Sequence, residues 1–311
     1  MSEHVDQSVV LANYASSALS AAGSLFIIIC FLCSKKIREI YHIRIVFSIG
    51  VANLLFTLSG AGELIPGILE NDGQNPICKA FGFVRQFFSV ASVLLTAVFA
   101  LMVLLWSSSK LSNIRKYEAI SMTLVGVISL ATSLYILLAD KLGYSTLICW
   151  IRNDLPEKET FILFFVEFYG IFFLVLLMNF YCFIQTIRKK RSNMNNWQAF
   201  QLLLFPGVLL FCFLGALVDR IVLARDQKSP RWLQVWHIIG AQLFGLCNAL
   251  IYGFSRNIRI IVKESFSNCC LCRKKPKQSM TSTMITKPLI SPADDSSSSS
   301  EQLNISEIIA K

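Results

Sequence analysis

Apolar residues along this chain form long uncharged runs, and the charged residues gather in short connections between them. Crossing about 30 Å of hydrocarbon as a helix that rises about 1.5 Å per residue takes roughly 20 apolar residues. Seven runs reach that length. They predict seven membrane-spanning helices, at about residues 9–33, 43–69, 77–106, 119–139, 160–187, 198–224 and 233–254.

The connections are too short to hold a folded domain outside the bundle, and Gly, Pro and charged residues cluster in them, as in residues 70–76. We therefore expect an all-α membrane protein with an extracellular segment at 1–8 and a seven-transmembrane helix bundle at 9–254. Residues 255–272 predict a short amphipathic cytoplasmic helix that ends in a cysteine cluster. Residues 273–311 are rich in Ser and Thr, cannot bury a core, and predict a disordered cytoplasmic tail.

Lys and Arg concentrate in the first, third and fifth connections and after the seventh helix. The first eight residues carry neither, and the second connection carries Glu70 and Asp72 instead. The sixth connection is an exception, because it carries Arg225, Lys228 and Arg231 although it lies on the same side as the second connection. Because cytoplasmic connections carry the excess of Lys and Arg, we expect the N terminus outside and the C terminus in the cytoplasm.

The composition agrees with a membrane protein: 54% of the 311 residues are apolar and 15% are charged, against about 25% charged in soluble domains. A net charge of +10 is typical of nucleic-acid binders, and 10 Cys residues are typical of disulfide-rich secreted domains. The apolar excess fits neither class. We therefore expect no nucleic-acid partner and a chain that lies mostly in the lipid bilayer.

Cys78 and Cys149 are the cysteines at the predicted outer ends of the helices. Facing an oxidising compartment, they are expected to form a disulfide that holds the fourth connection over the third helix. Cysteines inside the spans are interpreted as small apolar side chains: Cys30, Cys33, Cys182, Cys212 and Cys247. The cluster beyond the bundle lies beside basic residues, so palmitoylation and inert thiols both stay open for Cys269, Cys270 and Cys272.

Six ionisable residues fall inside the predicted spans, where each is costly unless it faces water or a partner: Glu63, Arg85, Glu167, Asp219, Arg220 and His237. All six lie in the predicted outer halves of their helices, which favours an outward-opening polar cavity. In one interpretation these charges pair with one another and only hold helices together. In the other interpretation they bind a small polar ligand, and Arg85 and Arg220 donate forked hydrogen bonds to an anionic group of that ligand. Candidates for the apolar wall are then Phe83, Phe87, Phe168 and Trp236.

Pro66 in the second helix and Pro206 in the sixth remove backbone hydrogen bonds and are expected to kink their helices. The kink at Pro206 has two interpretations. It is a static bend, or it is a hinge about which the inner end of the sixth helix swings outward and opens a cytoplasmic cleft.

Four segments resemble a known family: Cys78-x-x-x-Gly82-Phe83-x-x-Gln86-Phe87-Phe88, Cys149-Trp150-Ile151, Asp219-Arg220-Ile221-Val222 and Asn248-Ala249-Leu250-Ile251-Tyr252-Gly253. Together they resemble the cyclic-AMP-receptor-like family of G-protein-coupled receptors over about residues 10–265, with a more distant similarity to secretin-type receptors. The third helix ends Leu105-Trp106-Ser107 and lacks the Asp-Arg-Tyr triplet of the rhodopsin-like class. The activation lock of that class therefore does not transfer to this chain.

The resemblance implies a plasma-membrane receptor that binds a small ligand outside and activates a heterotrimeric G protein inside. It also implies phosphorylation of the tail, with a kinase and an arrestin-like protein as partners. Only some members of the family bind cyclic AMP, so the ligand stays open. Six basic residues are expected to contact the G protein: Lys110, Arg115, Arg188, Lys189, Lys190 and Arg191. The alternative is that they only set the membrane orientation, because cytoplasmic loops are rich in Lys and Arg for that reason alone.

Other seven-helix functions find less support. A retinal protein needs a Lys in the seventh helix, and none occurs between Leu233 and Phe254. A zinc hydrolase needs several inward His residues, and His237 is the only His within a span. We therefore expect no enzyme activity, no catalytic residue, no metal and no cofactor. The alternative that stays open is a transporter with an outward-facing polar cavity, although no internal repeat is found.

Overall fold

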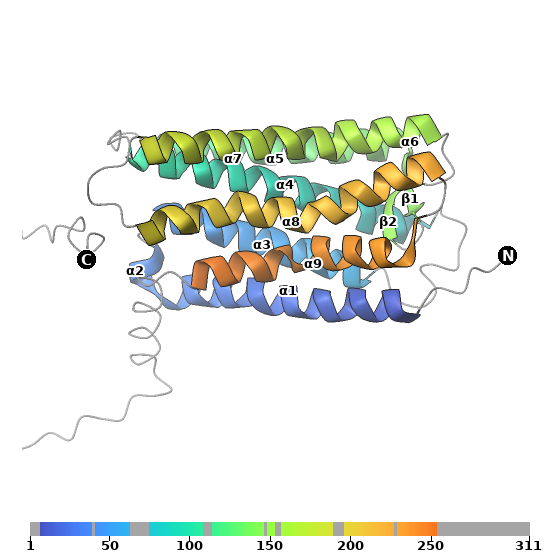
Figure 1. The fold of residues 1–311 in the computed structure, drawn as a ribbon, viewed down its shortest axis with the longest axis horizontal. Coiled ribbons are helices and arrows are strands. Elements are labelled where there is room, and N and C mark those ends of the chain that lie inside the picture. Colours follow the sequence, from blue (N-terminus) through green and yellow to red (C-terminus); the bar gives the residue numbers. More distant parts are fainter. Residues whose placement is uncertain are drawn as a thin grey trace, which may run out of the picture.

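The computed structural model describes residues 7–38, 41–62, 75–107, 114–145, 148–152, 157–188, 196–226 and 229–253. Within these ranges, seven helical spans are long and apolar enough to cross a membrane. The predicted seven-helix fold is therefore confirmed, and the spans lie side by side as one bundle (Figure 1).

Ten helical elements and one hairpin make up the described part of the chain. The helices are α1 (Gln7–Cys33), α2 (Lys35–Arg38), α3 (Tyr41–Gly62), α4 (Pro76–Ser107), α5 (Ile114–Leu138), α6 (Glu157–Phe164), the π turn η2 (Phe165–Tyr169), α7 (Gly170–Arg188), α8 (Asn196–Asp226) and α9 (Arg231–Gly253). The strands are β1 (Leu142–Ser145) and β2 (Ile148–Ile151). Elements α6, η2 and α7 follow one another without a break and form the predicted fifth span.

Several predictions fall outside the described residues and are not tested by the structure. They are the end of the second span with Glu63 and Pro66, the basic residues Lys110, Lys189, Lys190 and Arg191, the amphipathic helix, the cysteines Cys269, Cys270 and Cys272, and the tail. The domain boundaries drawn in the sequence therefore stay predictions.

Helix α4 lies at the centre of the bundle. It contacts α3, α5, α7 and α8, and both strands pack against its first turns. Its buried residues Val93 and Leu95 belong to the two large apolar clusters of the core. Helix α9 closes the other side of the bundle against α1 and α8.

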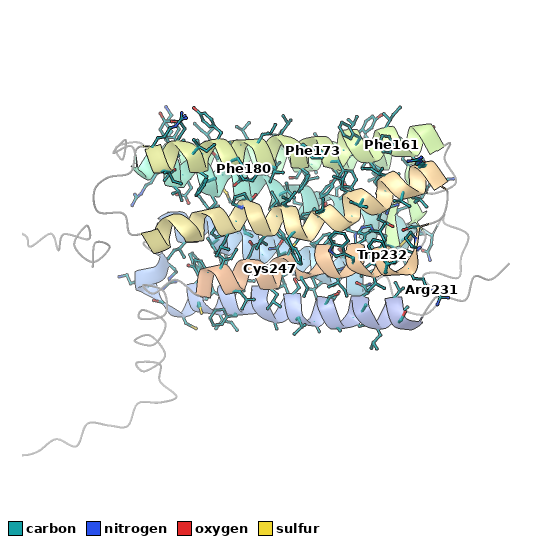
Figure 2. All side chains as sticks on the ribbon, in the orientation of Figure 1. Phe161, Phe173, Phe180, Arg231, Trp232 and Cys247 are labelled. Carbon is teal, nitrogen blue, oxygen red and sulfur yellow. A yellow bond between two sulfur atoms is a disulfide. The ribbon has the colours of Figure 1, made fainter. Side chains whose placement is uncertain are left out.

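The outer faces of the helices carry large apolar side chains. Leu138 is 82% exposed and Leu174 is 69% exposed, and Phe161 and Phe180 lie along the outside of α6 and α7 (Figure 2). Such a surface would be costly in water, but lipid tails are as apolar as these side chains. The exposed faces thus support the interpretation of the seven helices as membrane spans.

The hairpin β1–β2 was not predicted. Its strands pair antiparallel, with Leu142 opposite Ile151 and Tyr144 opposite Cys149, and all of β2 is buried. The predicted disulfide is present: Cys149 of β2 is bonded to Cys78 in the first turn of α4. The hairpin therefore lies against one end of the bundle, which we call the hairpin end.

Helix α8 continues through Pro206 as one helix and bends along its length (Figure 1). The break in hydrogen bonding expected at Pro206 thus does not end the helix.

Candidate functional site

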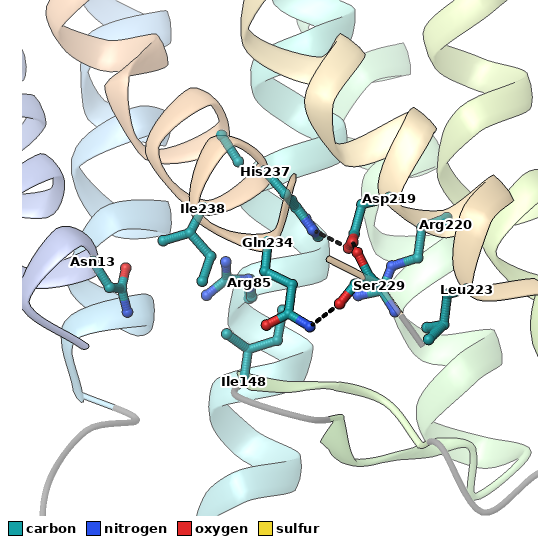
Figure 3. A pocket seen from close by; sticks show the side chains of 11 residues that line it. Asn13, Arg85, Ile148, Asp219, Arg220, Leu223, Ser229, Gln234, His237 and Ile238 are labelled. Atoms are coloured by element: carbon teal, nitrogen blue, oxygen red, sulfur yellow. Dashed lines mark hydrogen bonds and ion pairs between the residues drawn. The ribbon is translucent and has the colours of Figure 1, made fainter. Parts of the chain in front are cut away.

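A small polar cavity lies inside the bundle near the hairpin end. Its walls come from α1, α4, α8, α9, β2 and Ser229, which lies just before α9. Figure 3 shows the side chains that line it. The lining residues are Asn13, Arg85, Ile148, Asp219, Arg220, Leu223, Ser229, Gln234, His237, Ile238 and Ala241. We call this the arginine cavity. The cavity has a volume of about 50 Å³.

A second cavity of about 20 Å³ lies directly beside the first. The two share Arg85, Ile148, His237 and Ala241 as a common wall. The smaller cavity is more aromatic and is lined in addition by Phe56, Ser89, Trp150, Phe168, Tyr169, Phe213 and Ala216. Movement of the shared side chains would join the two spaces into one site with a charged half and an aromatic half.

Asp219 is the centre of a hydrogen-bonded group that ties α8 to α9. His237 Nδ1 lies 2.8 Å from Asp219 Oδ2, and the Ser229 hydroxyl donates to the other carboxylate oxygen. The Gln234 amide donates to the Ser229 backbone carbonyl at 3.1 Å (Figure 3). Because Asp219 is buried, these bonds replace the water that its carboxylate would otherwise bind.

Both arginines of the cavity are more than nine-tenths buried. The Arg220 guanidinium lies over the ring of Phe164 at 4.3 Å and that of Trp150 at 6.0 Å, and Arg85 lies over the ring of Phe56 at 4.9 Å. Aromatic faces attract cations, so these rings hold the two guanidinium groups at the cavity.

Gly60 on α3 makes room for Arg85. A Cβ atom at this position would come 2.9 Å from Arg85 Nη1 and 2.6 Å from Gln242 Nε2. A larger residue would therefore push the Arg85 side chain out of its present position.

The hairpin is anchored to the bundle by a buried glutamine. The Trp150 indole donates to Gln86 Oε1 at 2.6 Å, and Gln86 Nε2 donates to the Glu167 backbone carbonyl at 3.1 Å. Glu167 lies in the π turn η2, and π turns of this kind are frequent at functional sites. Gln86 thus connects β2, α4 and η2 next to the cavities.

The structure brings four of the six predicted site residues together: Arg85, Asp219, Arg220 and His237 all line the arginine cavity. Glu167 is buried but does not line either cavity, and its Oε2 has no hydrogen-bond partner among the described residues. Of the four aromatic residues predicted for the wall, Phe168 lines the smaller cavity. Trp236 packs against Gly215, and Phe83 packs against the core. Phe87 contacts the ring of Phe88.

Sequence reasoning missed the uncharged polar residues of the cavity. Asn13, Ser229 and Gln234 carry no charge, so the cost of placing a charge in a membrane span did not identify them. Gln234 had a usable signal, because it precedes His237 by three residues and therefore lies on the same face of α9. Among the described residues, no three His, Cys, Asp or Glu side chains come together in a way that could hold a metal ion.

Ion pairs at the surface hold the hairpin on the bundle. Lys79 of α4 donates to Asp140 at 2.5 Å, Arg152 Nη1 lies 3.5 Å from the same carboxylate, and Lys141 pairs with Glu159 at 2.6 Å. The hydrogen bond from Lys79 and then its positive charge lower the pKa of Asp140 below the ordinary value of 3.8. The carboxylate is exposed, so salt screens this attraction.

We expect Asp140→Asn to lower the melting temperature slightly at neutral pH and not at all in strong acid. A carboxyl group whose pKa is lowered by folding adds stability above its unfolded pKa, and that stability is lost as the pH falls through the lower, folded value. The difference between the native protein and the variant should therefore begin to shrink near pH 3.8 and disappear below the lowered pKa of folded Asp140. Melting curves at several pH values and salt concentrations measure it. A difference that persists in acid would contradict the proposed role of Asp140.

Residues 2–265 match the family described as "Slime mold cyclic AMP receptor". The chain is 25% identical over 286 residues to "G-protein coupled receptor 1" of Arabidopsis thaliana, a match that covers 83% of this chain and 82% of that protein. It is 28% identical over 162 residues to "Frizzled and smoothened-like protein L" of Dictyostelium discoideum. This match covers 47% of this chain and 25% of that protein.

Proposed function

This chain belongs to the slime mold cyclic AMP receptor family, and on that basis we propose that it is a G-protein-coupled receptor for a small anionic ligand. The ligand enters from outside the cell and binds in the arginine cavity. The observation that carries the proposal is the pair of buried arginines at one cavity of a seven-helix receptor-like protein. A receptor of this kind acts by binding and movement, without catalysis and without a metal or cofactor.

The charges of the cavity favour an anion. Among the described residues that line the cavity, Arg85 and Arg220 carry positive charges, and Asp219 carries a negative charge that is already bonded to His237 and Ser229. Arg220 Nε has no hydrogen-bond partner among the described residues. A phosphate or carboxylate group would accept hydrogen bonds from a guanidinium in the forked geometry that suits both groups.

The arginine cavity is too small for a nucleotide-sized molecule, so binding has to move its walls. The wall most suited to move is α8, which carries Asp219 and Arg220 and contains Pro206. A ligand anion that attracts Arg220 would compete with the contacts that tie α8 to α9. We propose that the resulting motion of α8 about Pro206 moves its inner half and opens the face that receives the G protein.

The opposite end of the bundle supplies the basic residues for that face. Arg115 at the start of α5 and Arg188 at the end of α7 are exposed there. We propose that they contact the G protein together with Lys110, Lys189, Lys190 and Arg191, which lie outside the described residues. This arrangement agrees with the positive-inside rule, with the N terminus outside and the plasma membrane as the location.

The same proposal extends to the segments beyond α9. Acylation of Cys269, Cys270 and Cys272 would anchor the region after the bundle to the inner leaflet. Phosphorylation of the Ser-rich tail would add negative charge and attract a basic, arrestin-like partner.

The experiment measures nucleotide exchange on a purified G protein by the receptor in nanodiscs, with cyclic AMP first and then other small phosphates and carboxylates. For the ligand that stimulates exchange, we expect Arg85→Ala to raise the half-maximal concentration roughly 10- to 150-fold, the value of a charge-assisted hydrogen bond. Arg85→Ala should reach the cell surface normally, because Arg85 itself does not belong to either of the large apolar clusters.

Lys141→Ala is the matched control, because Lys141 is a cation at the hairpin end that pairs with Glu159 and does not line the cavity. It should respond like the native receptor. A native response by Arg85→Ala would contradict the proposed site. Uptake of the radiolabelled ligand into vesicles that contain no G protein would favour the transporter instead.

A further inference from the structure

His237 lies where the charged groups of the two cavities meet. Together with Arg85, it lines both the arginine cavity and the smaller aromatic cavity. Its Nδ1 atom lies 2.8 Å from Asp219 Oδ2, and 12% of its side chain stays exposed (Figure 3). An imidazole gains or loses its charge near neutral pH, so His237 is a titratable group in the wall of a cavity that already holds fixed charges.

The contact with Asp219 determines which nitrogen of the imidazole carries the hydrogen. A carboxylate only accepts hydrogen bonds, so His237 Nδ1 donates to Asp219 Oδ2. The neutral ring then has no hydrogen on Nε2, and a second proton is added at that atom. This proton makes the ring cationic and gives it a second N–H donor, as an anion requires of a binding group.

The groups around His237 act on this second proton in opposite directions. Among the described residues, the charged or titratable side chains that line the cavities with it are Asp219 and Arg220 of α8, Arg85 of α4 and Tyr169 of η2. The carboxylate of Asp219 stabilises a positive charge on the imidazole, and the two guanidinium groups oppose it. The tyrosine hydroxyl is neutral near pH 7. The described cavity residues of α1, α3 and β2 carry no charge.

An anion in the arginine cavity would change this balance. Its negative charge offsets the repulsion between the two arginines and the imidazole, so His237 takes up a proton more readily when the anion is bound. Coupling between two bound species is reciprocal: each changes the affinity for the other by the same factor. A proton on His237 therefore strengthens the binding of the anion as much as the anion strengthens the binding of the proton.

We propose that the receptor binds its anion together with a proton, and that the proton goes to His237. This rests on the proposed function, because it concerns the same cavity and the same ligand. The affinity for the anion then rises as the medium becomes more acidic. Where one proton is taken up for each anion, the half-maximal concentration falls about tenfold for each unit by which the pH falls. Above the range in which the histidine titrates, the affinity no longer depends on pH.

The test measures the binding of sulfate to the purified full-length receptor in nanodiscs between about pH 5 and pH 8, the range in which histidines titrate. The charge of sulfate is constant over this range, so a change in its affinity comes from the protein. Bound sulfate raises the melting temperature, and the same titration of Arg85→Ala gives the general salt effect to subtract. We expect the dissociation constant of sulfate to fall by up to about tenfold per unit of decreasing pH.

His237→Gln replaces the ring with an amide that donates a hydrogen bond and does not titrate. The affinity of this variant for sulfate should be the same at every pH in the range. His42→Gln, at a histidine in the first turn of α3, is the matched control and should keep the pH dependence of the native receptor. A second measurement needs no variant: sulfate added to the native receptor in weak buffer at mildly acidic pH should cause proton uptake and raise the pH.

The possible outcomes separate the role of His237 from the proposed function. Sulfate binding that is the same at every pH and causes no proton uptake overturns the role of His237 and leaves the anion cavity standing. A pH dependence that persists in His237→Gln also overturns it, because another group then takes up the proton. Sulfate that stabilises the native receptor and Arg85→Ala equally at every pH contradicts both. Proton uptake by the native receptor, with a pH dependence lost in His237→Gln alone, supports both.

Discussion

A receptor carrying Cys149→Ala is expected to melt at a clearly lower temperature than the native protein and to lose its response to ligand. The bond joins residues 71 positions apart, and the loss of chain entropy in an unfolded loop of that length corresponds to about 4 kcal/mol. That value is an upper bound here, because membrane helices keep much of their structure when the bundle comes apart. The response is lost because β2, which contributes Ile148 to both cavities, loses its covalent bond to α4 and keeps only weaker contacts such as the hydrogen bond from Trp150 to Gln86.

Two variants serve as controls for the disulfide. Cys182→Ala removes a buried cysteine that has no covalent partner, so it should cost only the lost packing. Cys78→Ala combined with Cys149→Ala should melt near the temperature of either single variant, because one bond can be lost only once. Additive losses in the double variant would show that the two cysteines contribute independently.

The second large effect is expected from Asp219→Ala, which should destabilise the receptor by about 3–5 kcal/mol, the typical cost of removing one partner from a buried charged pair. The change leaves His237 and Ser229 without their acceptor and removes a negative charge that interacts with Arg220. Asp219→Asn keeps the shape of the side chain and an acceptor oxygen, so its loss should be smaller.

Thermal or chemical unfolding of the receptor in detergent measures this loss. Glu159→Ala breaks a surface pair with Lys141 and should change stability by less than about 1 kcal/mol. The effects of Asp219→Ala and His237→Ala should not add, because the two residues form one contact. Full additivity would mean that the bond between α8 and α9 contributes nothing.

The sequence predicts the seven spans well because their signal is local. Lipid requires about 20 apolar residues without charge, and each run satisfies that demand by itself. The hairpin has no such signal: its two strands are four residues each, and what stabilises them is the bond from Cys149 to Cys78 and burial against α4. Both contacts join residues that lie far apart in the chain.

The difference between local signals and long-range contacts also explains which site residues the sequence predicts correctly. The cost of a charge in lipid identified Arg85, Asp219, Arg220 and His237, which do line one cavity. Glu167 was expected with them, but the π turn at Phe165–Tyr169 adds a residue to one turn and changes which face of the span the neighbouring side chains occupy. No local pattern predicts that turn.

We propose that the arginine cavity opens to the outside of the cell, and labelling of a cysteine placed in its wall determines from which side of the membrane the cavity is reached. In cells expressing Gln234→Cys, a membrane-impermeant thiol reagent applied to the medium should react at the new cysteine, and a small anion that binds the cavity should slow the reaction. Arg115→Cys, at the exposed start of α5, should react only when the reagent reaches the cytoplasmic side. Labelling of Gln234→Cys from the cytoplasmic side alone would contradict both the orientation and the function proposed for this receptor.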